Sequence, residues 1–300
     1  MTVQHSNMSK LRAHLQVLPR PFASPVVWAG VALGAVLAGT SLVNALLVGL
    51  SATLVMAWGH SGNTFWDFHV TKLDQGEGHS RAKPYSSGQN VLTSGLLSTQ
   101  AVVVNMVLWL WLSTVPLLFL RDPLLWVLWA IAVACGPIYS WAKLHYLPET
   151  ILLIGFGICP VLMGALAGPG YPIGNAIAAS LPFGLLFGFA AEIIDQKYDC
   201  TPQAWAKGLR SIGPWLWKTE RKVAPVILFI MALAGSAHIG LGISGILAQQ
   251  SLWALFAFFP AAVVAPGWDQ TGRDQDRAIM IGLFCIFAYC VLLVIGQAMS

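Results

Sequence analysis

Residues 25–67 read PVVWAGVALGAVLAGTSLVNALLVGLSATLVMAWGHSGNTFWD, and no Asp, Glu, Lys or Arg occurs between Pro25 and Trp66. A helix needs about 20 apolar residues to cross the hydrocarbon core of a bilayer. This stretch is therefore long enough for two crossings, and the Gly39-Thr40-Ser41 segment marks the expected turn between them. The charge-free run ends at Asp67, which is the first carboxylate in the chain.

The composition of the whole chain excludes a soluble globular protein. Hydrophobic residues make up 57% of it and charged residues only 9%, whereas a soluble domain carries about 25% charged residues. Apolar runs predict seven more membrane helices, in segments 91–120, 123–142, 150–191 (two helices), 223–268 (two helices) and 278–300. We therefore expect an all-α polytopic membrane protein with nine transmembrane helices, forming one domain over residues 25–300 after a cytoplasmic tail over residues 1–24.

The basic residues indicate the direction of the chain across the membrane. Fifteen of the 16 Lys and Arg residues lie in the tail or in segments 67–90, 143–149, 195–222 and 269–277, and only Arg121 lies elsewhere. Because cytoplasmic loops are enriched in basic residues, we expect the N-terminus and these loops in the cytoplasm, with the bacterial inner membrane as the location. The positive net charge follows from this topology and indicates no nucleic-acid partner. The five cysteines lack metal-ligand spacing and are interpreted as small packing residues.

Two groups of acidic residues end two of the predicted helices on this same side. The first group is Asn63 and Asp67 with Asp74 and Glu77, and the second is Glu192, Asp195 and Asp199. Residues three or four apart share one face of a helix, so each group is expected to point several oxygen atoms in one direction. Facing carboxylates repel one another unless a cation lies between them. Because Mg²⁺ prefers oxygen ligands and often binds one or two carboxylates plus phosphates, the two groups predict a magnesium–diphosphate site.

Each group has a plainer interpretation as well. Acidic residues at a helix end are often only solvated, but two such groups at same-side ends of separate spans favour a function. A diphosphate also needs basic donors. Lys83 and Lys143 are the first candidates, and Arg81 and Lys207 come next, although each basic residue is also explained by membrane topology alone.

The order of these motifs resembles the UbiA superfamily of intramembrane prenyltransferases over nearly the whole chain. The family's first motif is similar to NTFWD at 63–67 followed by KPYSSG at 83–88, and its second to DQKYD at 195–199. YSWAKLHYLPE at 139–149 looks like the family's Tyr-containing segment. The dihydroxynaphthoate (menaquinone) branch is the most similar, on the basis of RPFASP at 20–25 and ASLPFGLL at 179–186.

The chain departs from the family pattern at several positions. Thr64 replaces a common Asp, Thr71 stands where a third acidic residue is usual, and Glu192 stands where Asn is frequent. The run after Asp199 is also altered. These departures leave diphosphate chemistry as the expectation and place the acceptor in question.

The resemblance implies nine helices around a central cavity, Mg²⁺ as cofactor, and transfer of a prenyl group from a prenyl diphosphate to a small aromatic, quinone-precursor-like acceptor. It implies Asp67, Asp74, Glu192, Asp195 and Asp199 as metal ligands. Asn63, Asp67, Tyr139, Asp195 and Asp199 are the implied catalytic residues, and Arg81, Lys83, Lys143 and Lys207 the implied diphosphate-binding residues. Membrane lipid is the only other partner indicated, and no obligate protein partner is evident.

Two other functions stay open at this point. A terpene cyclase of the same superfamily would close the prenyl chain on itself without an acceptor. A transporter is disfavoured because its polar groups should gather near the middle of the membrane. Aromatic candidates for facing an allylic cation are Phe65, Trp66, Tyr139 and Trp141, and His69 and His145 are candidates for handling the acceptor proton.

Overall fold

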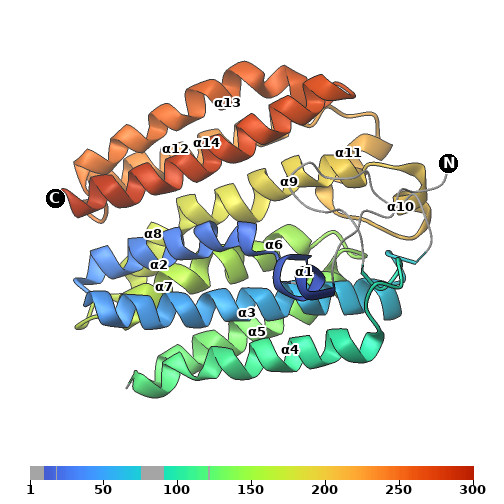
Figure 1. Cartoon of the computed structure of the whole chain (residues 1–300). Helices are drawn as coiled ribbons and strands as arrows, with labels where there is room; N and C mark the ends of the chain where they lie inside the picture. Colours follow the sequence, from blue (N-terminus) through green and yellow to red (C-terminus); the bar gives the residue numbers. More distant parts are fainter. Residues whose placement is uncertain (1–9, 18, 76–90, 121) are drawn as a thin grey trace.

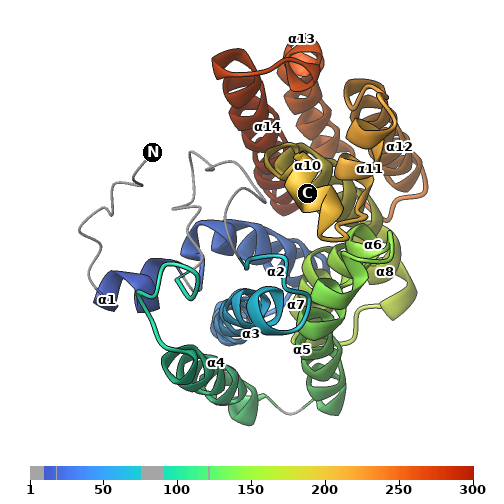
Figure 2. The same ribbon diagram turned by 90° about the vertical axis from the view of Figure 1, so that its right-hand side faces the viewer.

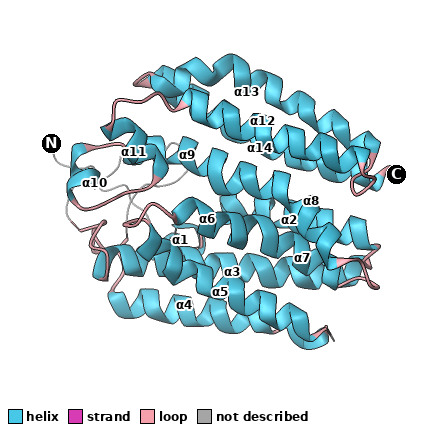
Figure 3. Ribbon diagram, turned by 180° about the vertical axis from the view of Figure 1, so that it is seen from behind, coloured by secondary structure: helices cyan, strands magenta, loops and turns pink. Residues whose placement is uncertain are grey.

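The computed structural model describes residues 10–17, 19–75, 91–120 and 122–300, and within these ranges every regular element is a helix and none is a strand. The long helices lie alongside one another in a single bundle (Figures 1 and 3). The label η marks segments with 3₁₀ or π geometry.

The stretch that opens the chain's apolar part folds as two consecutive helices, α2 (Ser24–Ala38) and α3 (Leu42–His69). The turn lies where the sequence predicts it. Gly39 ends α2 in the left-handed conformation, with φ 61°, which glycine adopts without a Cβ penalty. Ser41 then caps α3, because its side chain accepts a hydrogen bond from the backbone N–H of Asn44.

Seven more apolar helical segments follow α3. They are α4 (Thr99–Thr114) with η3 (Pro116–Phe119); α5 (Pro123–Ala142); α6 (Pro148–Leu152) with η4 (Leu153–Ile158) and α7 (Cys159–Leu166); α8 (Ile173–Leu185) with η5 (Leu186–Ala191), α9 (Glu192–Asp195) and η6 (Gln196–Asp199); α12 (Ala224–Ile243); η7 (Gln249–Ala257) with α13 (Phe258–Val264) and η8 (Ala265–Asp269); and α14 (Arg273–Ala298).

Among the described residues, eight helices are long and apolar enough to cross a membrane, which indicates a multi-pass integral membrane protein. The sequence predicts nine. The difference lies in α2, whose 15 residues fall short of the roughly 20 needed for a full crossing. The predicted turn at Gly39 leaves only residues 25–38 for the first crossing, so the short length of this helix is already present in the sequence.

The two ends of the bundle differ in character. The short helices α10 (Pro202–Ala206) and α11 (Ile212–Lys218) lie at one end, close to the ends of α3 and α9, and the C-terminus lies at the other end (Figures 1 and 2). The remaining short elements are α1 (Lys10–Arg12), η1 (Ala13–Val17) and η2 (Pro21–Ala23). The segments with α10 and α11 are ones that the sequence assigns to the cytoplasm, and this direction across the membrane stays a prediction.

Two glycines allow α2 and α7 to approach backbone to backbone. A Cβ on Gly34 of α2 would overlap the carbonyl oxygen of Val161 on α7, and a Cβ on Gly164 would overlap that of Val31. Close contact of this kind through small residues is typical of helix packing in membranes. It makes α2 and α7 tightly packed partners.

Two π segments shape the part of the bundle that precedes the second acidic group. η4 and η5 pack against each other, and a Cβ on Gly188 of η5 would overlap the backbone of Leu153 in η4. A π turn adds a residue to the helix and redirects the side chains that follow, and such turns are frequent at functional sites. Here η5 ends directly before Glu192.

Candidate active site

A cavity of about 580 Å³ lies inside the bundle, bounded by α2, α3, α5, η4, α7, η5, α9 and α14. Its polar lining gathers toward the bundle end that carries α10 and α11, whereas the rest of the wall is largely apolar. The polar lining residues among those described are Arg20, His60, Asn63, Tyr139, Glu192 and Asp195. The cavity therefore combines a polar mouth with an apolar body.

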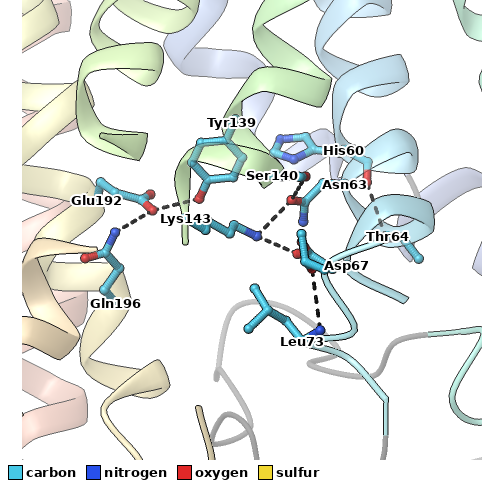
Figure 4. Close-up of polar contacts among 11 residues, drawn as sticks. His60, Asn63, Thr64, Asp67, Leu73, Tyr139, Ser140, Lys143, Glu192 and Gln196 are labelled. Carbon is cyan, nitrogen blue, oxygen red and sulfur yellow. Dashed lines mark hydrogen bonds and ion pairs between the residues drawn. The ribbon is translucent and has the colours of Figure 1, made fainter. Parts of the chain in front are cut away.

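The wall formed by α3 is tied to α5 through one lysine. Nζ of Lys143 donates hydrogen bonds to Oδ1 of Asn63 at 2.8 Å and to Oδ2 of Asp67 at 2.5 Å (Figure 4). Ser140 also donates to Oδ1 of Asn63 at 2.9 Å, and Thr71 donates to Oδ1 of Asp67 at 3.2 Å. Asp67 is buried, and the lysine supplies the positive charge that a buried carboxylate needs.

The opposite wall is tied to α5 through a tyrosine. The Tyr139 hydroxyl donates to Oε1 of Glu192 at 2.7 Å, and Nζ of Lys143 lies 4.8 Å from the centre of the Tyr139 ring (Figure 4). Tyr139 and Lys143 thus stand between the acidic group on α3 and the acidic group on α9. Of the two groups, Asn63 from the first and Glu192 and Asp195 from the second line one cavity, and Asp67 is joined to Asn63 through Lys143.

A buried hydrogen-bond network through Gln196 and Glu149 holds the Glu192 side chain. Nε2 of Gln196 donates to Oε1 of Glu192 at 2.9 Å and to Oε1 of Glu149 at 3.1 Å. The backbone N–H of Gly213 donates to Oε1 of Gln196, and that of Ile212 donates to Oε1 of Glu149, both at 2.9 Å. The network fixes the orientation of Glu192 relative to α6 and α11. The sequence analysis missed both Glu149 and Gln196.

The remaining predicted metal ligands have different positions. Asp195 lines the cavity, but Asp199 is absent from the described lining. Residues 196–199 form a 3₁₀ turn, so the α-helical spacing from which the sequence predicted a shared direction does not apply. Asp74 lies beside Asp67, because its backbone N–H donates to the Asp67 carbonyl oxygen at 3.0 Å.

The four predicted diphosphate-binding residues also have different positions. Lys143 is outside the described lining, but its ammonium group donates to Asn63, which lines the cavity. Lys207 is outside the described lining, because its ammonium group donates to the backbone carbonyl oxygens of Leu73 and Gln75 and so holds the turn after α3. Arg81 and Lys83, together with Glu77, lie outside the residues that the structure describes.

Three of the four aromatic candidates do not belong to the described lining of the cavity. The Phe65 and Trp66 rings pack edge to face, and Trp141 is 54% exposed and stacks on His145. Tyr139 alone of the four lies on the wall. The other aromatic lining residues are Phe156, Phe187, Phe284 and Phe287.

The two histidine candidates, His69 and His145, are also outside the described lining of the cavity. The ring of His69 lies 3.0 Å from the Thr99 hydroxyl, and His145 stacks on Trp141, so neither lines the cavity. His60 lines it instead. Its spacing of three residues before Asn63 was a usable signal, since such residues share a helix face.

Arg20 is a further residue that the sequence analysis missed. It lies before η2 and lines the cavity with its backbone in the left-handed region, at φ 47°. This conformation is unfavourable for a residue other than glycine and is often found at functional sites.

The oxygen atoms at the mouth fit a magnesium ion that is completed by a substrate. No group of three or more His, Cys, Asp or Glu side chains within the described ranges forms a metal cluster by itself. Asn63 and Asp67 offer oxygens from one wall, and Glu192 and Asp195 offer them from the other. Mg²⁺ commonly takes one or two carboxylates and fills its remaining positions with phosphate oxygens and water, so this donor set fits the ion without a preformed cage.

No protein-family model matches the sequence, and no curated protein sequence matches it either. Solved structures do. A UbiA homologue from Aeropyrum pernix K1 has a TM-score of 0.66 and 18% identity, with 92% of this chain and 97% of that chain covered. The chain has the fold of the UbiA homologues. A digeranylgeranylglyceryl phosphate synthase has a TM-score of 0.66 at 17% identity, over 98% of this chain and 100% of that one.

A third neighbour is a UbiA homologue from Archaeoglobus fulgidus, solved with DMAPP and Mg²⁺. Its TM-score is 0.62 at 17% identity, and the match covers 96% of this chain and 99% of that chain. The match to the UbiA fold spans the helices that carry both acidic groups. At these identities the likeness establishes the fold, and the chemistry has to be argued from the cavity.

Proposed function

We propose that this protein is a Mg²⁺-dependent intramembrane prenyltransferase that moves a prenyl group from a prenyl diphosphate to an aromatic, quinone-precursor-like acceptor. The observation that carries the proposal is the shape of the cavity, with a charged mouth and a long apolar body. A prenyl diphosphate has the same division into a charged head and an apolar tail. The Archaeoglobus homologues solved with DMAPP or GPP and Mg²⁺ support this assignment.

The residues at the mouth have two roles in binding the head group: carboxylates hold Mg²⁺, and basic residues bind the diphosphate. Asp67, Glu192 and Asp195 hold Mg²⁺, with Asp74 and Asp199 as further ligands near the same walls. When bound, the ion stabilises the negative charge that develops as diphosphate leaves. Lys143 and Arg20 bind diphosphate oxygens, and Arg81 and Lys83 are proposed to complete the set. Lys207 contributes by holding the turn that contains Asp74.

The apolar body has two roles in the reaction. It receives the prenyl chain, and it keeps water from the allylic cation that forms when the C1–O bond breaks. The faces of the lining rings, among them Tyr139 and Phe187, stabilise positive charge. Asn63 is held by Ser140 and Lys143 at the boundary between the two regions, where the reacting carbon of the donor would lie.

The acceptor class follows from the similarity of RPFASP and ASLPFGLL to the dihydroxynaphthoate branch. The second candidate is a terpene cyclase, and the observation that favours it is the ring of four phenylalanines around one cavity. Such a wall can fold a single prenyl chain and direct its cyclisation.

Acceptor dependence tests the proposal. Purified protein receives geranyl, farnesyl or geranylgeranyl diphosphate with Mg²⁺, first alone and then with dihydroxynaphthoate, hydroxybenzoate or homogentisate. We expect the donor to stay mostly intact until a suitable acceptor is added, and a chelator to abolish transfer. Cyclic terpenes formed without acceptor, at a rate that added acceptor does not change, would replace the transferase with the cyclase.

A further inference from the structure

His60 lines the apolar part of the cavity and is half-buried as a residue. Its Nε2 atom is fully buried and has no hydrogen-bond partner. The ring lies 6.0 Å from the ring of Phe156, which also lines the cavity. Figure 4 shows the imidazole on the same side of α3 as Asn63, directed toward α5.

An unpaired ring nitrogen in such surroundings is unfavourable. A buried polar atom without a partner loses its hydrogen bonds to water and gains none in return. Most buried polar groups in folded proteins are paired, so an exception calls for a reason. The buried histidine His238 shows the usual arrangement, because Ser251 and Tyr289 occupy its two ring nitrogens.

The position of His60 along α3 matches the level expected for the aromatic acceptor, which is the second substrate. At a rise of about 1.5 Å per residue, His60 lies about 4.5 Å below Asn63 and about 10 Å below Asp67 along α3. The diphosphate is expected at the level of Asp67 and Lys143, and C1 of the donor is bonded directly to it. An acceptor ring that reacts with C1 therefore lies at the level of His60.

The wall beside His60 is open at Gly59, whereas Gly136 on α5 packs closely against Trp58. A Cβ on Gly59 would meet no heavy atom within 4 Å, and both Gly59 and Gly136 line the cavity next to this turn of α3. A planar aromatic acceptor can occupy this space with one polar substituent turned to the imidazole. No other histidine within the described ranges lines the cavity.

We infer that Nε2 of His60 binds a hydroxyl group of an aromatic acceptor and takes its proton during transfer, an inference that rests on the proposed prenyltransferase function. The donor's C1–O bond breaks, and its electron pair leaves with diphosphate. A ring carbon of the acceptor forms the new bond to C1 while the O–H electron pair moves toward the ring and the proton passes to Nε2. The keto product becomes aromatic again when the proton on that ring carbon is lost and the oxygen regains one.

The test compares two substitutions of His60 with one of His238. His60→Phe removes both ring nitrogens but keeps an aromatic ring, and His60→Gln restores a hydrogen-bonding group that cannot take a proton. His238→Phe is the matched control, since it removes a buried histidine outside the cavity. Measurements are kcat and the acceptor KM with 1,4-dihydroxy-2-naphthoate, the donor KM, and binding of an unreactive prenyl thiolodiphosphate.

We expect His60→Phe to lower transfer by about 100-fold or more, the range for loss of a general base, and to raise the acceptor KM. His60→Gln should recover the acceptor KM but not kcat. Both variants should bind the thiolodiphosphate like the wild type. The inference is overturned if His60→Phe transfers normally, or if donor binding and the acceptor KM worsen in parallel. If the wild type itself transfers to no aromatic acceptor, the proposed function fails instead.

Discussion

Nζ of Lys143 lies 2.5 Å from Oδ2 of Asp67, and both side chains are largely withdrawn from solvent, with exposed fractions of 14% and 4%. A buried carboxylate without a counter-ion is costly. Lys143 therefore supplies a counter-charge to Asp67 within the protein itself. The same ammonium group bonds Asn63, so one cation organises the wall of the cavity on which the proposed metal site depends.

The ion pair between Lys143 and Asp67 predicts that substitutions can change stability and activity independently. Lys143→Met leaves the buried Asp67 carboxylate without a counter-ion and should destabilise the protein by about 3–5 kcal/mol, the usual cost of breaking a buried ion pair. The double variant Lys143→Met/Asp67→Asn should regain most of this stability, because no unpaired charge remains, yet stay inactive. Thermal unfolding in detergent and a transfer assay measure the two effects. Equal melting temperatures for the single and double variants would contradict the role given to Lys143.

The hydrogen bond from Tyr139 to Glu192 predicts a metal-dependent defect. Tyr139→Phe keeps the ring but removes the hydroxyl that orients the carboxylate. We expect activity to fall about 10–100-fold, as when a group that orients a metal ligand is lost, with a higher Mg²⁺ concentration needed for half-maximal rate. Tyr171→Phe, in the connection between α7 and α8, is the control. An unchanged Mg²⁺ dependence in Tyr139→Phe would argue against Glu192 as a ligand.

The orientation of the chain can be tested at two exposed positions. Gln203 lies in α10 at the proposed cytoplasmic end, and Ser300 lies at the opposite end of the bundle (Figure 1). In a background without the five native cysteines, Gln203→Cys should react with an impermeant thiol reagent only from the cytoplasmic side. Ser300→Cys should react only from the other side. Labelling of both from one side would contradict the predicted topology.

The apolar part of the fold could be read from the sequence because charges are excluded from lipid. This rule gave the full extent of α5, since Asp122 and Lys143 bound a charge-free run, whereas the turn at Gly39 was predicted from its Gly-Thr-Ser sequence. The rule counted α2 as a full crossing, although the turn at Gly39 leaves this helix only 15 residues.

The site was predictable where the helix is regular. Asn63 and Asp67 share a face of α3, so their spacing predicts a common direction, and Lys143 is a candidate because it follows the end of α5 on the same predicted side. Asp199 lies in a 3₁₀ segment, where α-helical spacing does not predict the direction of a side chain. Arg20 was missed because it lies outside the regular helices, and whether its side chain reaches a cavity depends on how distant segments pack.

A second buried network lies away from the cavity and should affect only stability. His238 on α12 lies 2.8 Å from the Ser251 hydroxyl, and the Tyr289 hydroxyl lies 2.9 Å from its Nδ1 atom. These bonds join α12, η7 and α14. Tyr289→Phe should cost about 0.6–1.7 kcal/mol, the range measured for such bonds between membrane helices. Melting temperature should fall while kcat per folded molecule is unchanged; a lower kcat would connect this network to the chemistry.

The crossing of α2 and α7 gives the last prediction, in which two identical substitutions should have opposite effects. Gly34 leaves no room for a Cβ beside the carbonyl of Val161, whereas a Cβ on Gly240 of α12 would meet no heavy atom within 4 Å. Gly34→Ala must push the two backbones apart and should cost about 1–3 kcal/mol. Gly240→Ala should stabilise its helix by about 0.5–1 kcal/mol, because alanine loses less backbone entropy on folding. Thermal unfolding of both variants in the same detergent measures the difference. Because α2 and α7 both line the cavity, Gly34→Ala should also raise the donor KM, and a variant with normal stability and normal donor KM would show that the two helices are not in backbone contact.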